Sequence, residues 1–427
     1  MSRHSPFFAG AVQGAVLCLA LAACHDLTSL DQDAPSRIPA DQLELPENAA
    51  LLVRGAVGDF ECALANYIVA GGLVADELGN AVLQNDIWDF DRRTITPVNA
   101  YYATETCGEN VGAPTVYTVL STARYDADHS VQLLDGWTDE EVPERTSLIA
   151  TASAYGGYSL VLLGEGMCSA AIDVGPELTR AQLLAEAETR FSRAIEAATE
   201  SGENDIGQLA LVGRARARLD LGDLAGAAAD AAQVLPGFVV NATYSSTKPR
   251  RENLVFTYTH RELNATVDLP FRDLTFGGVP DPRVVVVDAE MVGADAQTPI
   301  FQPTKYPSIE SPIPVATWEE AQLILAEAAL AGVGSGDAVD IINTLHANAG
   351  LPPYAGGTPD EVMAQVIEER SRELFLEGQR LGDMIRYDLP LFPAAGTPFP
   401  VAGGTFGSQV CFPLPAVERL NNPNIPD

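Results

Sequence analysis

The chain has 427 residues, enough for one large domain or two to three ordinary ones. Apolar residues make up 47% of it, so a core can form, while the net charge is −33. A surface this acidic repels phosphate backbones, which argues against nucleic-acid binding. It also repels anionic lipid, so a membrane attachment needs something other than a basic patch.

Residues 1–23 have the layout of a secretory signal peptide, with Arg3, an apolar run from Phe7, and then small residues. A transmembrane anchor is the alternative, but the run is short and no charged stop follows it. The stretch Leu21 to Cys24, which includes the last three residues of this segment, resembles the lipobox of bacterial lipoproteins. This resemblance implies that Cys24 carries lipid such as palmitate. If the signal is cut elsewhere, Cys24 is an ordinary thiol. We expect residues 24–47 to be a lipidated, polar tether.

Four cysteines follow the tether: Cys62, Cys107, Cys168 and Cys411. Their spacing fits no metal-binding pattern, and the histidines show no metal or catalytic motif either. An even number in an exported chain indicates two disulfides, for which three pairings are possible. We favour Cys62–Cys107 with Cys168–Cys411, and free buried thiols are the alternative.

Helical periodicity runs from about Asn48 to Ile68 and resumes in residues 114–134 and 144–164. Residues 181–235 hold Ala-rich helices around a Leu-Gly-Asp turn at 221–223, which is the tetratricopeptide pattern with a period of about 34 residues. A generic Ala-rich hairpin is the alternative, although Phe191 and the turn favour the repeat. Residues 317–350 form another such helix pair.

Residues 236–317 have a different character, rich in Pro, Gly, Thr and aromatic residues. Apolar runs at 253–259 and 283–291 predict short strands there. An insert of about 80 residues is far longer than an ordinary connection, so we expect it to act at the surface. The prediction is a mainly α fold of tetratricopeptide-like helix pairs, with a large irregular loop-rich insert and few short strands. One domain spans 48–427: a helical part 48–235, the insert 236–317, and a helical part with tail 318–427.

The densest charge lies in residues 369–388, ERSRELFLEGQRLGDMIRYD, which we call the signature segment. It resembles the C-terminal signature helix of the SusD/RagB family of outer-membrane nutrient-binding lipoproteins, matching at Glu369, Arg370, Glu373, Leu374, Glu377, Gly378, Arg380, Asp383 and Arg386. Further segments match in chain order: DPRV at 281–284, EAQLILAEAAL at 320–330 and FPLPAVERLNNPN at 412–424. Residues 336–351 also match, although His346 and Asn348 stand where the family has arginines.

The signature segment is either an active site or a structural frame. As one helix, it places opposite charges at i,i+3 spacing, in the pairs Glu369–Arg372, Arg370–Glu373, Glu377–Arg380, Arg380–Asp383 and Asp383–Arg386. A glycosidase acid needs a raised pKa in an apolar pocket, whereas arginines beside these glutamates would lower their pKa. We therefore expect a frame that ties the helix to loops. Glycine within a helix is unfavourable, so we also expect a close backbone approach at Gly378.

The best local candidate for a ligand surface surrounds Trp88, with Asn85, Asp86, Asp89 and Arg92. A sugar needs an aromatic face for its C–H side and amides, carboxylates or guanidinium for its hydroxyls; a peptide could use the same set. In the family, loops after the first helix contribute to the ligand surface, so the resemblance favours this stretch. An aromatic plug under a long loop is the alternative.

The resemblance as a whole implies a non-catalytic, cofactor-free lipoprotein of the cell outer membrane that faces the exterior. It would bind an oligosaccharide or a peptide and deliver it to a TonB-dependent transporter. A scaffold lipoprotein that uses its tetratricopeptide-type repeats to bind only other proteins is the alternative from another class.

Overall fold

The structure, a computed structural model, describes residues 38–99, 101–104, 106, 107, 114–401 and 403–425. The expected signal peptide and Cys24 lie outside the described residues. The chain divides into two compact units, Met1–Leu45 and Pro46–Asp427. The described part of the first unit holds the short helix α2 (Ala40–Leu43). Everything below concerns the second unit.

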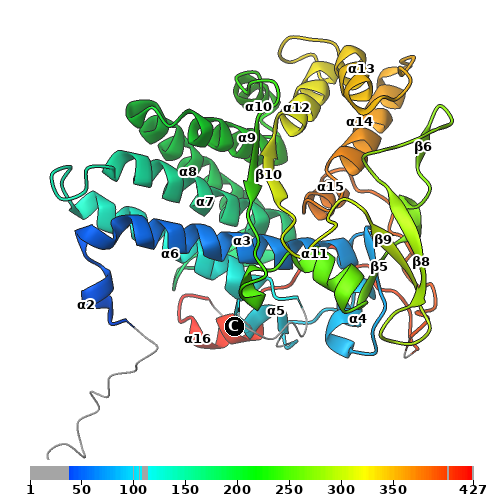
Figure 1. Cartoon of the computed structure of the whole chain (residues 1–427), viewed down its shortest axis with the longest axis horizontal. Helices are drawn as coiled ribbons and strands as arrows, with labels where there is room; N and C mark the ends of the chain where they lie inside the picture. The colour runs from blue at the N-terminus through cyan, green and yellow to red at the C-terminus, as the bar shows by residue number, and fades with distance from the viewer. Residues whose placement is uncertain (1–37, 100, 105, 108–113, 402, 426–427) are drawn as a thin grey trace, which may run out of the picture. The chain divides into compact units, whose positions relative to one another are not determined.

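Helices dominate the second unit, as the sequence predicts (Figure 1). The longer ones are α3 (Ala49–Val74), α6 (Tyr117–Gly136), α7 (Arg145–Gly166), α8 (Arg180–Ser201), α9 (Asn204–Asp220), α12 (Trp318–Leu330), α13 (Ala338–Ala349) and α14 (Pro359–Glu373). The shorter ones are η2 (Pro46–Asn48), α4 (Asn85–Asp91), α5 (Tyr101–Thr104), α10 (Leu224–Ala231), η3 (Pro249–Arg251), α11 (Leu254–Phe256), η4 (Thr257–Arg261), η5 (Leu269–Phe271), α15 (Arg380–Arg386) and α16 (Ala416–Asn421).

Strands of the described residues are short and occur in antiparallel pairs. They are β1 (Leu78–Asn80) with β5 (Ala265–Val267), β2 (Ser169–Ala171) with β3 (Glu177–Thr179), β4 (Val239–Ala242) with β10 (Ile313–Thr317), β6 (Thr275–Phe276) with β7 (Val279–Pro280), and β8 (Val286–Val292) with β9 (Pro299–Pro303). The β4–β10 pair places the two ends of the insert side by side.

The helical layer is a stack in which α3, α6, α7, α8 and α9 pack in succession (Figure 1). Small residues allow this close packing. A Cβ atom at Gly157 of α7 would lie 2.7 Å from the ring of Phe191 of α8, and one at Gly213 of α9 would overlap the same ring. Phe191, fully buried, therefore fills the space that the glycines leave. The tetratricopeptide-like architecture is confirmed.

Helix α3 continues six residues past the predicted end at Ile68, to Val74. Residues 69–74 are all buried, so the one-sided periodicity that reveals a surface helix is absent there. Within the described residues, 46–74 and 145–166 are long and apolar enough to cross a membrane. However, 89% and 83% of their most apolar windows are buried inside the structure, as in core helices of a folded domain.

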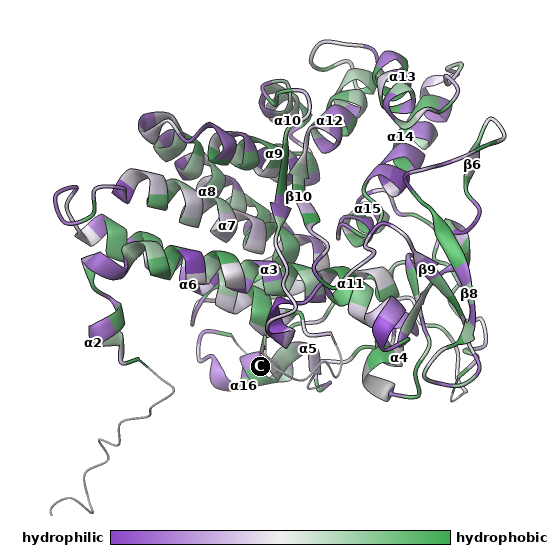
Figure 2. Cartoon of the chain, in the orientation of Figure 1, coloured by the Kyte–Doolittle hydropathy of each residue, from purple (hydrophilic) through white to green (hydrophobic). Residues whose placement is uncertain are grey.

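The insert departs from prediction at residues 253–259, which form α11 and the start of η4 instead of a strand. Asn253 caps the first turn by accepting from the amide of Phe256, and its own amide donates to the carbonyl of Ser311. Leu254, Val255 and Tyr258 are buried together on the inner side. The β8–β9 hairpin does form, and Figure 2 shows apolar residues along β8, of which Val287 and Val292 are exposed.

The signature segment is not one helix. Helix α14 ends at Glu373, α15 begins at Arg380, and the backbone between them turns through Leu376 and Gly378 at positive φ angles of 56° and 84°. Buried Glu77 holds the turn by accepting from the amide of Leu376 at 2.7 Å. The close approach at Gly378 does occur, since a Cβ there would lie 3.1 Å from Ile68. Its φ also favours glycine.

Because of this turn, the charges of the signature segment pair mainly across the fold. Of the expected i,i+3 pairs, the structure has Asp383–Arg386, at 3.2 Å. The other charges make these links: Arg283 to Glu369 and Glu373, Arg370 to Asp383, Arg372 to Asp281, Arg380 to Asp76, Arg386 to Glu327, and Lys305 to Glu377. These links tie α14 and α15 to the end of α3, to α12 and to the insert. The arrangement is that of a frame.

Two disulfides join distant parts of the chain, in the pairing that the sequence favoured. Cys62 of α3 bonds to Cys107, which follows α5. Cys168, just after α7, bonds to Cys411 in the C-terminal tail. They join Cys107 and the tail before α16 to the helical stack.

Candidate functional site

Helix α4 presents one face to the core and the other outward. Ile87 and Phe90 are 0% and 2% exposed, whereas Trp88 and Asp89 are only partly buried. Asn85 and Asp86, predicted to contribute, form the first turn of this helix. The helical period thus separates Ile87 and Phe90 from Trp88 and Asp89.

Asp89 is the centre of a hydrogen-bonded group. Its carboxylate accepts from Arg92 at 2.9 Å, from the hydroxyl of Thr94 at 2.9 Å and from the amide of Asn99 at 3.2 Å. Arg92 also donates to Thr94, at 2.9 Å. We call these four residues the Asp89 cluster. Thr94 and Asn99 were not among the predicted ligand residues. The only local hint is that they are polar residues flanking Pro97, a pattern typical of a turn, in which Asn99 accepts from the amide of Thr96.

The indole of Trp88 packs against a small apolar group in the C-terminal loop, formed by Phe399, Val401 and Phe406. Arg93, 2% exposed, anchors that loop by donating to the carbonyls of Phe392 and Gly407, both at 3.1 Å, and of Pro393. The loop therefore shelters one side of Trp88 while the ring remains partly exposed. The packing of Trp88 is thus established, whereas its role in ligand binding stays a prediction.

Buried carboxyls near α4 are unsuited to catalysis. Burial raises the pKa of Asp91 and of Glu77 to about 7, a value that suits a general acid. These residues are only 7% and 1% exposed, so a substrate does not reach them, and each accepts a backbone amide. The expectation that arginines lower the pKa of the signature glutamates is wrong for Glu373 and Glu377, where burial raises it. Both are nevertheless held in ion pairs with Arg283 and Lys305.

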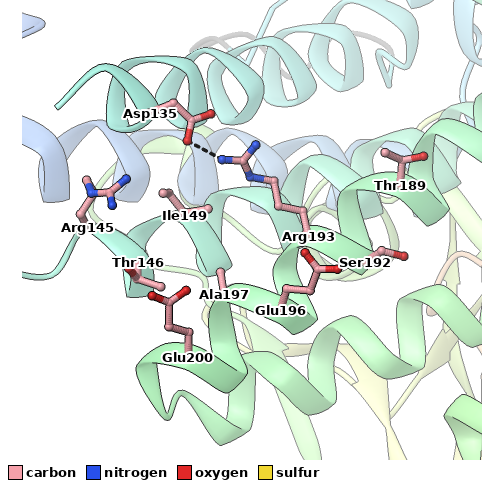
Figure 3. A pocket seen from close by; sticks show the side chains of 10 residues that line it. All are labelled: Asp135, Arg145, Thr146, Ile149, Thr189, Ser192, Arg193, Glu196, Ala197 and Glu200. Atoms are coloured by element: carbon pink, nitrogen blue, oxygen red, sulfur yellow. Dashed lines mark hydrogen bonds and ion pairs between the residues drawn. The ribbon is translucent and has the colours of Figure 1, made fainter. Parts of the chain in front are cut away.

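A hollow of about 520 Å³ lies among α6, α7 and α8 (Figure 3). We call it the acidic trough. Arg193 pairs there with Asp135, and Arg145 pairs with Asp139 at 2.7 Å. Its lining among the described residues includes no aromatic side chain. Since no ring face is offered there for the C–H side of a sugar, this trough is a poorer nutrient site than the α4 surface.

Comparison with known proteins identifies the fold. The family model for the SusD family matches residues 320–411. A solved SusD superfamily protein from Bacteroides vulgatus matches with a TM-score of 0.65 and 15% identity, covering 89% of this chain and 98% of its own. The chain has a SusD-like fold. The resemblance to the SusD/RagB family seen in the sequence is thereby confirmed.

Two further solved structures that match have ligands in their names. A laminarin binding SusD-like protein matches with a TM-score of 0.62 and 15% identity, over 89% of this chain and 98% of its own. Surface glycan-binding protein A from Bacteroides thetaiotaomicron matches with a TM-score of 0.62 and 16% identity, covering 88% of this chain and 97% of its own. No curated protein matches the sequence.

The SusD family match and the α4 surface lie in different parts of the chain. Residues 320–411 contain most of α12, all of α13, α14 and α15, and Cys411. Trp88 and the Asp89 cluster precede the matched region, and the C-terminal loop that shelters Trp88 lies within it. The matched region therefore includes the signature segment, while Trp88 and the Asp89 cluster lie outside it.

Proposed function

We propose that this SusD-like protein binds an oligosaccharide on the α4 surface, without catalysis, and delivers it to a TonB-dependent transporter of the outer membrane. The observation that carries the proposal is a partly exposed indole beside the Asp89 cluster, on a fold shared with glycan-binding proteins. A peptide nutrient is the alternative ligand that the same groups would suit.

The chemistry of the α4 surface suits a sugar. A pyranose ring places its C–H face on an aromatic ring, and its hydroxyls need both donors and acceptors. Trp88 offers the ring, while Arg92 and Asn99 donate and Asp89 accepts. Hydrogen bonds within the cluster hold these groups in place before the ligand arrives, which lowers the entropy lost on binding. A micromolar dissociation constant, roughly −8 kcal/mol, is the expected range.

A pair of tryptophan variants tests the site. Trp88→Ala should weaken binding to the best glycan found on a glycan array by about tenfold or more, with little change in melting temperature. Trp137→Ala is the control, since Trp137 is also partly buried but packs at the end of α6, against a different apolar cluster. Intact binding by Trp88→Ala together with a large loss of stability would show that Trp88 is only a plug.

The proposed setting is a lipoprotein whose residues 1–23 are removed and whose Cys24 carries the lipid, with residues 24–47 as tether and 48–427 as the binding domain. Cys24→Ser should then release a soluble or unprocessed form in cell fractionation, and unchanged membrane attachment would contradict the anchor. Purification from detergent-solubilised membranes should recover a TonB-dependent barrel. Recovery of soluble protein partners instead, with no glycan or peptide bound, would favour a scaffold.

A further inference from the structure

A cavity of about 360 Å³ lies between α6 and α16. Tyr117 and Tyr125 line it from α6, and Glu418 and Asn421 line it from α16. We call it the tyrosine groove. Its volume is within the range of small-ligand sites, and no residue of the Asp89 cluster lines it.

Tyr125 offers an exposed aromatic ring in this groove. It is 49% exposed and borders the cavity between α6 and α16. The ring of His129, one turn later on α6, stacks nearly parallel to it, with centroids 5.5 Å apart and an interplanar angle of 9°. This stacking holds the tyrosine ring in one orientation, so a ligand does not have to order it.

Oriented polar groups accompany the ring. The hydroxyl of Tyr117, a residue only 5% exposed, accepts from the backbone amide of Ala171 at 3.4 Å. The Glu418 carboxylate accepts from the side-chain amide of Asn422, at 3.0 Å. In the described part of the chain, Thr122 and Asn421 line the groove without a hydrogen bond from their own side chains. The groove thus combines a fixed ring with hydroxyl, carboxylate and amide groups, the set that recognises sugar hydroxyls.

The walls of the groove are rigid. Helix α6 belongs to the helical stack, and α16 follows the disulfide-bonded Cys411. The amide of Asn422, at the end of α16, donates to the carbonyl of Gly175 at 2.8 Å. Sites on fixed elements hold their geometry better than sites on free loops.

The groove is also connected to the α4 surface. The amide of Ala416, the first residue of α16, donates to the carbonyl of Pro97 at 2.8 Å. Pro97 lies between Thr94 and Asn99 of the Asp89 cluster, so one short segment contacts both places. The hydroxyl of Thr118 on α6 in turn donates to the carbonyl of Ala103 in α5, which follows that segment. A long ligand would meet the two surfaces in succession.

We propose that the tyrosine groove is a second carbohydrate-binding site, which takes a mono- or disaccharide unit of the same oligosaccharide that Trp88 holds. This rests on the proposed function. A peptide is the alternative ligand for the groove, as it is for the α4 surface. Two linked sites bind a long chain more tightly than either alone.

The test uses calorimetry on the purified mature protein with a length series of oligosaccharides from the best glycan of the array. Tyr125→Ala should weaken binding of the longest oligosaccharides about fivefold or more and leave the shortest bound one unchanged. Tyr125→Phe, which keeps the ring, should bind like the wild type. Leu420→Ala is the control on α16, because Leu420 is 83% exposed and does not line the groove.

The outcomes separate the two proposals. Equal affinities of Tyr125→Ala and wild type at every length would overturn the groove and leave the Trp88 site standing. An equal loss at every length, with a lowered melting temperature, would also overturn it, because that result marks a structural residue. If the wild type bound no glycan on the array, or bound only peptides from a peptide library, both proposals would fail.

Discussion

Asp383 is the residue whose replacement best tests the frame. It is 5% exposed, and its carboxylate accepts from Arg370 at 2.8 and 3.0 Å and from Arg386 at 3.2 Å. These guanidiniums lower the pKa of Asp383 although burial alone would raise it. Asp383→Asn keeps the shape and removes the charge, which leaves the buried guanidinium of Arg370 without its carboxylate.

Breaking a buried ion pair from one side costs about 3–5 kcal/mol. Unfolding entropy is about 2.1 cal/mol/K per residue, so over the unit Pro46–Asp427 that loss should lower the melting temperature by about 4–6 °C. Urea unfolding followed by circular dichroism measures the free-energy change, and a thermal melt measures the temperature.

The matched control is Asp139→Asn. Asp139 pairs with Arg145 at 2.7 Å, but its side chain is 74% exposed, so we expect less than about 1 kcal/mol. If Asp383→Asn changed stability no more than Asp139→Asn, the interpretation of the signature segment as a frame stabilised by buried ion pairs would be refuted.

Two further predictions concern packing and pH. Gly213→Ala should destabilise the protein by about 1–3 kcal/mol because the new methyl group overlaps Phe191, whereas Gly207→Ala in the same helix should stabilise it by about 0.5–1 kcal/mol. Urea unfolding of both variants measures these changes, and destabilisation of equal size would contradict the prediction. Burial raises four carboxyl pKa values to about 7 from ordinary values of 3.8 or 4.5, those of Glu77, Asp91, Asp126 and Glu320. The folded protein therefore binds more protons than the unfolded chain between about pH 4 and 7, so stability should fall as pH rises through that window and level off above it. A free energy of unfolding at pH 8 no lower than at pH 5 would contradict this.

Local patterns in the sequence determined the helical elements. One-sided periodicity predicted α8 and α9, and the turn at 221–223 appears as Gly222 at a φ of 81° followed by Asp223 capping α10. Asp337 likewise caps α13, two residues after Ser335. These features depend on residues a few positions apart, which is the range over which helical propensity and capping act.

Tertiary contacts decided where local signals failed. The apolar run at 253–259 became helical because Asn253 both caps the turn and bonds to Ser311. The signature segment forms two helices with a turn between them, because Glu77, 299 residues away in the chain, accepts from the amide of Leu376. Neither partner is visible in the local sequence.

The candidate sites divide in the same way. From the sequence alone, Trp88 is seen to lie among polar residues after the first helix, and a mainly α fold is predicted. The three-dimensional packing shows that the C-terminal loop shelters Trp88, that Thr94 and Asn99 bond to Asp89, and that α16 lies opposite Tyr125. The physical reason is that these surfaces arise from hydrogen bonds and packing between segments as much as 314 residues apart, and such pairings leave no period or motif in the chain.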